Sequence, residues 1–102
     1  MHKSNTERRS PLLRGNVVER LLLSCTSGCS LEEIRSKLDS QSTFVIKIYL
    51  FILIDHAILS YNGKKRCYMI EKEGFNLLEY IHFEKARRKV DSSDIEITIE
   101  YP

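Results

Sequence analysis

The sequence predicts a single α+β domain, and three stretches of the 102-residue chain support that prediction. The first is a long apolar run within residues 40–59, which exceeds a typical strand and follows serines that can cap a helix. The second is Asn62-Gly63 between extended, aromatic-containing runs, which indicates a β-hairpin. The third is the tail at residues 95–101, which alternates with the period of a half-buried strand. A chain of this length supports one modest core.

The composition excludes wholesale disorder and a membrane-spanning helix. Hydrophobic residues make up 42% of the chain and charged residues 29%, as in an ordinary globular protein. The longest uncharged apolar run, residues 48–54, is too short to cross a bilayer, and the N-terminus carries no apolar signal core. We therefore expect a cytoplasmic protein without a membrane partner.

Charge is unevenly distributed along the chain. The net charge is +2, and four carboxylates lie in the last dozen residues, so residues 1–90 carry a net charge of +6. The cations form three clusters: Lys3, Arg8, Arg9 and Arg14; Lys64, Lys65 and Arg66; and Lys85, Arg87, Arg88 and Lys89. Clustered cations indicate a polyanionic partner, although any one cluster is more often only a solvated face.

Two helices are expected in the first part of the chain, after a polar basic arm at residues 1–10. Apolar residues at three- and four-residue spacing predict a helix over 12–25, with Pro11 in its first turn. Ser30 and Glu33 have the spacing of a capping box, which predicts a second helix over 31–38.

The apolar run predicts a third helix, over about residues 41–56. Ile46, Leu50 and Leu53 would share its core face, and the chain from Ala57 to Leu59 would leave it in an extended conformation. Its N-terminal end is polar, with Gln41, Ser42, Thr43 and Lys47. A helix that is buried along one face and polar at its tip suits insertion into a DNA major groove. A plain core helix with a serine cap is the structural alternative.

A hairpin, a long helix and a strand should complete the chain. Asn62 and Gly63 both tolerate the positive φ of a two-residue turn, so Tyr61 and Lys64 would flank it, with the cations at residues 64–66 at the tip. The helix over 71–90 should bury Leu77, Leu78 and Ile81. Phe75, Tyr80 and Phe83 would remain on other faces and suggest a partner helix. The strand over 95–101 must add to the hairpin sheet or pair with another subunit.

Three helices, a hairpin and a further helix follow one another in the order of winged helix-turn-helix proteins. Residues Leu50, Leu53, Ala57, Ile58 and Leu59 resemble the motif L-x-x-L-x-x-x-G-L-I of that family. The run from Tyr68 to Gly74, followed by Leu77-Leu78, resembles Y-x-L-T-x-K-G-x-x-L-L. The C-x3-C of Cys25 and Cys29 is similar to small archaeal winged-helix regulators, including the Sso10a-like DNA-binding proteins and winged-helix proteins of crenarchaeal viruses. A viral member would reside in the host cytoplasm.

The sequence departs from these motifs at two positions. Ala57 stands where the family usually has glycine, and we expect a negative φ there, which alanine can adopt. Glu71 stands where threonine usually caps the last helix, and its charge still favours a helix N-terminus.

The resemblance implies a homodimeric transcription regulator that binds double-stranded DNA. Residues 1–10 would be a flexible basic arm, residues 11–90 the winged-helix domain with its dimerisation helix, and residues 91–102 an acidic strand tail. The positions expected to contact DNA are Gln41, Ser42, Thr43 and Lys47 of the recognition helix, Asn62, Lys64, Lys65 and Arg66 of the wing, and Arg8 and Arg9 of the arm. Leu78, Tyr80 and Ile81 lie in the helix expected to form the subunit contact.

The cysteines and histidines give no sign of catalysis. Cys25, Cys29 and Cys67 lack zinc spacing and are most simply small buried hydrophobes, with a disulfide as the alternative, which a thermophilic host would favour. No paired carboxylates, nucleophile motif or phosphate-binding glycine loop is present, so we expect no enzyme, metal or cofactor. A second hypothesis keeps the same fold but uses it as a protein-interaction module that docks through Ile48, Phe51, Ile52 and Tyr80.

Overall fold

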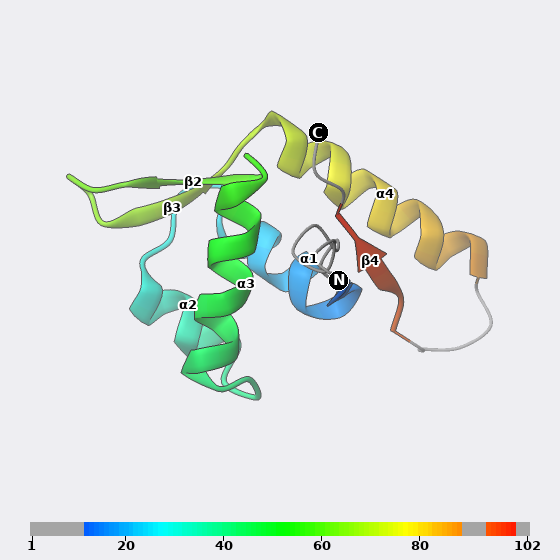
Figure 1. The fold of residues 1–102 in the computed structure, drawn as a ribbon, viewed down its shortest axis with the longest axis horizontal. Coiled ribbons are helices and arrows are strands. Elements are labelled where there is room, and N and C mark those ends of the chain that lie inside the picture. The colour runs from blue at the N-terminus through cyan, green and yellow to red at the C-terminus, as the bar shows by residue number, and fades with distance from the viewer. Residues whose placement is uncertain (1–11, 89–93, 100–102) are drawn as a thin grey trace, which may run out of the picture.

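The computed structural model describes residues 12–88 and 94–99, and in them the chain is an α+β domain as predicted (Figure 1). The elements in chain order are β1 (Leu12–Arg14), α1 (Gly15–Ser24), α2 (Leu31–Lys37), α3 (Thr43–Asp55), β2 (Leu59–Asn62), β3 (Cys67–Ile70), α4 (Lys72–Arg88) and β4 (Glu96–Thr98). Strands β2 and β3 form one antiparallel pair, and β1 and β4 form another.

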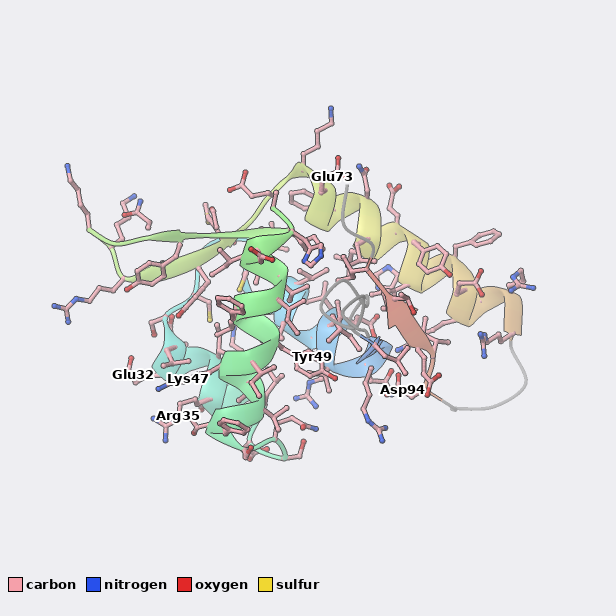
Figure 2. All side chains as sticks on the ribbon, in the orientation of Figure 1. Glu32, Arg35, Lys47, Tyr49, Glu73 and Asp94 are labelled. Atoms are coloured by element: carbon pink, nitrogen blue, oxygen red, sulfur yellow. The ribbon has the colours of Figure 1, made fainter. Side chains whose placement is uncertain are left out.

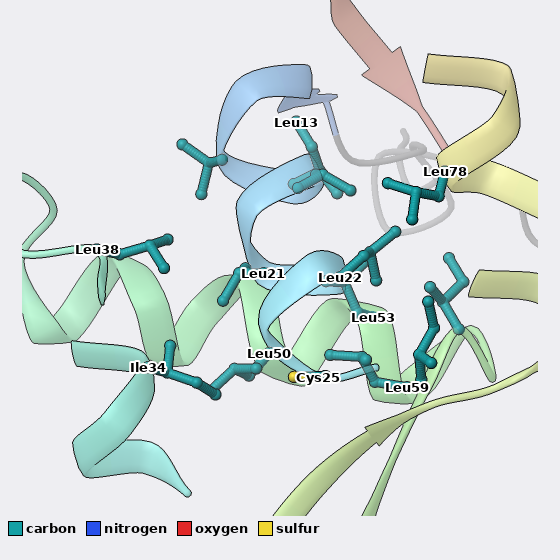
Figure 3. Close-up of a cluster of buried hydrophobic side chains, with 14 of the residues drawn as sticks. Leu13, Leu21, Leu22, Cys25, Ile34, Leu38, Leu50, Leu53, Leu59 and Leu78 are labelled. Atoms are coloured by element: carbon teal, nitrogen blue, oxygen red, sulfur yellow. The ribbon is translucent and has the colours of Figure 1, made fainter. Parts of the chain in front are cut away.

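The hydrophobic core forms around α1, which contributes Val18, Leu21 and Leu22, all fully buried. Helix α3 covers α1 with the face that its spacing predicts, since Ile46, Leu50 and Leu53 are also buried. Figure 3 shows side chains from α1, α2, α3, β2 and α4 meeting in this cluster. One face of α3 is therefore fully used inside the domain, and the opposite face is turned to solvent.

The start of the chain differs from the prediction of a helix over 12–25. Residues 12–14 form β1, which pairs with β4, and α1 begins only at Gly15. The amide of Gly15 donates a hydrogen bond of 2.7 Å to the carbonyl of Ile95. A Cβ at position 15 would lie 2.5 Å from Cγ1 of Ile95, so this close approach needs glycine. Pro11 lies outside the described residues.

The C-terminal strand also pairs differently from either predicted arrangement. It does not add to the hairpin but pairs antiparallel with β1 of the same chain, with Ile97 opposite Leu13. Immediately before it, Asp94 accepts a 2.8 Å hydrogen bond from the amide of Asn16. The side chain of Arg14, the N-cap residue of α1, makes no capping hydrogen bond. The carboxylate of Asp94, 78 positions after Asn16 in the chain, therefore satisfies the Asn16 amide in the first turn of the helix.

The capping box before α2 is confirmed. The hydroxyl of Ser30 accepts from the amide of Glu33 at 3.2 Å, and the carboxylate of Glu33 accepts from the amide of Ser30 at 2.9 Å. These hydrogen bonds with Ser30 hold the pKa of Glu33 below its ordinary value. The sequence signal and the local structure therefore agree, because both partners belong to the same short segment.

Helix α3 ends in a motif that contradicts the conformation expected of Ala57. The amide of Ile58 donates to the carbonyl of Leu53 at 2.9 Å, and the amide of Ala57 donates to the carbonyl of Ile54 at 3.0 Å. These two bonds define a Schellman motif, which requires a left-handed residue after the C-cap. Ala57 accordingly has a φ of +61°, so the prediction of a negative φ was wrong.

Candidate nucleic-acid interface

Gln41 and Ser42 lie in the turn before α3, and Thr43 is the first residue of the helix. Helix α3 begins at Thr43, so Gln41 and Ser42 precede the helix that was expected to start at about residue 41. The hydroxyl of Ser42 accepts the amide of Val45 at 3.1 Å as the N-cap, which commits that oxygen to the helix itself. The side chain of Gln41 is half-buried, while its amide donates to the carbonyl of Leu38.

These three residues line a shallow hollow of about 480 Å³ between α2 and the start of α3. Helix α2 contributes Glu32, Arg35 and Ser36 to it, and Asp39 contributes a second carboxylate. The hollow therefore brings the predicted hydroxyl and amide groups together, but it carries both signs of charge. A phosphate would meet Arg35 favourably and the two carboxylates unfavourably.

The outward face of α3 is more apolar than expected of a recognition helix. Phe44, Ile48 and Phe51 are 73%, 40% and 71% exposed, and their spacing of four and three residues places them in one stripe. Lys47 is exposed beside this stripe, and in Figure 2 it projects toward Glu32 and Arg35 of α2. The exposure of Phe44 was missed in the sequence, although its spacing to Ile48 and Phe51 could have revealed it.

The three consecutive cations of the second cluster lie at the tip of the β2–β3 hairpin, as predicted, but the turn itself differs. Strand residue Asn62 still pairs with Cys67, which leaves a four-residue loop at residues 63–66. The side-chain oxygen of Asn62 accepts the amides of Lys64 and Lys65 at 3.0 and 3.1 Å. The left-handed residue is Arg66, with a φ of +54°, whereas neither Asn62 nor Gly63 has a positive φ. The prediction of a two-residue Asn-Gly turn was therefore wrong.

Strand β3 of the hairpin is tied to the segment before α2. Cys29 and Tyr68 exchange two backbone hydrogen bonds of 3.0 and 2.8 Å, which form a bridge between the two segments. The rings of Tyr61 and Tyr68, a cross-strand pair, are 4.8 Å apart between centroids. Figure 1 shows the hairpin extending past α3 on the side where α2 lies. The loop cations thus have a fixed base relative to α2 and α3.

The hairpin cations and Lys47 differ from those of α4 in their electrostatic environment. No carboxylate in residues 12–88 or 94–99 lies within 4.0 Å of Lys47 or of the cations at residues 64–66. In α4, by contrast, Lys85 contacts Glu19 at 2.6 Å and Arg87 contacts Glu84 at 2.8 Å. The hairpin charges are therefore available to a partner, whereas those two α4 charges are balanced within the subunit.

The cysteines are free thiols in this structure. Cys25 and Cys29 are buried core residues, and burial raises the pKa of Cys25 to about 12. Burial also raises the pKa of Cys29. A neutral, buried thiol is a poor nucleophile and a poor metal ligand. Among the described residues, no three His, Cys, Asp or Glu side chains form a group that could hold a metal ion.

The remaining predicted positions fall into two groups. Leu78 is 8% exposed and Ile81 is fully buried inside the subunit's own core, while Tyr80 is 49% exposed. Of the three residues assigned to a subunit contact, only Tyr80 thus offers surface to a partner. Arg8 and Arg9 lie outside the described residues.

Comparison with known proteins adds no family assignment. The sequence matches no protein-family model, and no curated protein is significantly similar to it. In the described part of the chain, no helix has the length and apolar character needed to cross a membrane.

Proposed function

We propose that this chain is a winged helix-turn-helix protein that binds double-stranded DNA and acts as a homodimeric transcription regulator. The order α1, α2, α3 and the β2–β3 hairpin supports this fold, as does the Cys29–Tyr68 bridge, which adds a third short extended segment to the hairpin. In this arrangement α3 enters the major groove and the hairpin contacts the phosphate backbone.

The observation that carries the proposal is the hairpin tip. Lys64, Lys65 and Arg66 are exposed and lack carboxylate partners among the described residues. The hairpin that carries them extends past α3 (Figure 1) on the side toward which Lys47 projects (Figure 2). Phosphate contacts from such cations position a protein on DNA without reading its sequence. Sequence preference must then come from α3.

The test is the salt dependence of binding to duplex DNA. Each phosphate contact contributes about 0.9 to the slope of log affinity against log salt concentration. Changing the three hairpin cations to alanine should therefore weaken binding to every duplex and flatten the slope by up to about 3. Changing Arg14, Lys72 and Arg88, three exposed cations away from the hairpin, to alanine removes the same charge and should leave the slope nearly unchanged. An equal loss in both triple variants would rule out a specific role for the hairpin.

A dimer through α4 is the second part of the proposal. Glu73, Asn76, Tyr80, Phe83 and Arg87 recur at three- and four-residue spacing on the side of α4 away from Leu78. Glu73 and Arg87 each lie seven residues from Tyr80. In an antiparallel, two-fold pairing of α4 centred on Tyr80, Arg87 of one subunit would therefore face Glu73 of the other at both ends of the contact, in addition to the Glu84 that it contacts within its own subunit.

A hollow beside this seam supports the same pairing. It has a volume of about 640 Å³, and its lining includes Leu77, Tyr80 and Ile97. In the pairing centred on Tyr80, the exposed ring of Phe83 in one subunit would lie opposite Leu77 of the other, next to this hollow. Burying that ring would remove one of the largest exposed apolar side chains from water.

A charge exchange tests the dimer by light scattering after size-exclusion chromatography. Arg87→Glu should place like charges at both ends of the seam and shift the protein toward monomer. Adding Glu73→Arg in the same chain restores the opposite pairs and should restore the dimer. If the single and double variants have the same mass, α4 does not form the contact as described.

A protein-interaction module is the second candidate function, and the exposed stripe of α3 favours it. Ile48 and Phe51 offer apolar surface, as the interaction hypothesis expects, while Ile52 is only partly exposed and Tyr80 lies on a different helix. Retention on immobilised duplex DNA at moderate salt, lost at high salt, supports DNA binding. Failure to be retained at any salt concentration, together with a stable protein complex recovered from lysate, supports the interaction module.

A further inference from the structure

The stripe on α3 has a chemical character that bears on which DNA the protein would prefer. The side chains of Phe44, Ile48 and Phe51 have no donor or acceptor that could form a hydrogen bond with the edge of a base. Lys47 is an exposed donor beside them. Ser42 commits its hydroxyl to the N-cap, and Gln41 is half-buried before the helix. A helix with this surface is poorly equipped for readout by hydrogen bonds.

One feature of the major groove matches an apolar side chain. Thymine carries a 5-methyl group on the groove floor, and apolar residues, phenylalanine among them, make contact with it. Cytosine has no such group at the equivalent position. An apolar recognition surface therefore distinguishes A·T from G·C pairs through thymine methyl groups.

We propose that α3 recognises thymine 5-methyl groups by apolar contact with Phe44 and Phe51, so that the preferred target is a thymine-rich duplex. This inference rests on the proposed DNA binding. The two rings lie seven residues apart, which at 1.5 Å per residue is about 10 Å along the helix. At 3.4 Å per base step, the two methyl groups contacted would be separated by about three base pairs.

The charges around the stripe favour DNA over an apolar protein surface as its occupant. Lys47 flanks the stripe without a carboxylate within ion-pair distance in the described residues, and the hairpin cations extend on the same side. Asp55 is exposed at the C-terminal end of α3, where it would repel phosphates. Phe44 and Lys47 lie in the N-terminal half of α3 and Phe51 lies one turn before Asp55, so the segment from Phe44 to Phe51 enters the groove and the C-terminal end at Asp55 stays outside it.

Replacing thymine with uracil tests the inference because it removes only the methyl group. Affinity is measured at one fixed salt concentration for a thymine-rich duplex and for the same duplex with uracil in place of thymine. Loss of two methyl contacts should weaken binding about tenfold. In a G·C-rich duplex, replacing cytosine with 5-methylcytosine should strengthen binding.

Two protein variants assign the effect to α3. Phe44→Ala combined with Phe51→Ala should bind thymine and uracil duplexes equally while keeping its salt dependence. The matched control, Phe75→Ala combined with Leu23→Ala, removes two exposed apolar side chains outside α3 and outside the proposed dimer seam, and should keep the preference for thymine. Both pairs are exposed, so circular dichroism should show an unchanged fold.

The outcomes separate this inference from the function on which it rests. Equal, salt-dependent binding of the wild type to both duplexes would overturn methyl recognition and leave DNA binding intact. A preference for thymine that survives the Phe44 and Phe51 changes would also overturn it. If the wild type binds no duplex at any salt concentration, the proposed function itself fails.

Discussion

Replacing Ala57 with glycine should stabilise the protein, although it removes a methyl group. Ala57 has a φ of +61°, where its Cβ crowds the following carbonyl oxygen, at a cost of about 1–2 kcal/mol. Glycine avoids that cost, but it lowers the free energy of unfolding by about 0.4–1 kcal/mol because it gives the unfolded chain more conformational freedom. The net expectation is a gain of about 1 kcal/mol in the free energy of unfolding.

Thermal unfolding measures this gain directly. With an unfolding entropy of about 2.1 cal/mol/K per residue over the 102-residue chain, 1 kcal/mol corresponds to a rise in Tm of about 5 °C. Urea denaturation should show a higher midpoint with the same slope, because the surface exposed on unfolding hardly changes.

Ala86 provides a matched control, since it is the only other alanine of the chain. It lies within α4, where glycine costs about 0.5–1 kcal/mol, so Ala86→Gly should lower Tm. The two substitutions are chemically identical and should have opposite signs. A fall in Tm for Ala57→Gly would refute the left-handed conformation and with it the Schellman motif that ends α3.

Three further predictions concern the capping residues and a partly exposed ion pair. Asp94→Ala should cost about 0.5–2 kcal/mol in urea denaturation by removing the cap of α1. Glu96→Ala, whose side chain makes no hydrogen bond or ion pair with the described residues, should cost less than about 0.5 kcal/mol. Ser30→Ala should cost about 0.5–2 kcal/mol by the same measurement, because it removes one half of the capping box. Burial raises the pKa of Glu19, but Lys85 and His82 outweigh it and hold that pKa below 4.5. The contacts of ionised Glu19 with Lys85 and His82 therefore stabilise the fold above about pH 4.5, and this stabilisation is lost at lower pH. Glu19→Gln should accordingly be more destabilising at pH 7 than at pH 3.

Features that depend on neighbouring residues could be predicted from the sequence. The capping box needs only Ser30 and Glu33, and the core face of α3 needs only the spacing of Ile46, Leu50 and Leu53. The tip position of Lys64 to Arg66 follows from its place between two extended runs. In each case the determining interactions span a few residues, so local periodicity and turn chemistry suffice.

Features that depend on distant partners could not be predicted in the same way. Whether residues 12–14 form helix or strand is decided by β4, more than eighty positions away, because an available strand edge outweighs a weak helical pattern. The prediction of a two-residue hairpin loop was wrong for a different reason. Asn62 satisfies the amides of Lys64 and Lys65 with its side chain, which stabilises a longer loop than Asn-Gly usually forms.

The cation clusters show why the candidate site needed the structure. In the sequence, the runs at residues 64–66 and 85–89 hold three and four cations and are equally ambiguous. In the folded chain, Lys85 is committed to Glu19 on α1 and Arg87 to Glu84, whereas the hairpin cations have no described carboxylate within ion-pair distance. An uncompensated cation keeps its full attraction for a phosphate, and a paired one must first lose its carboxylate. Binding to DNA should therefore depend on the hairpin far more than on α4, although composition alone treats the two clusters alike.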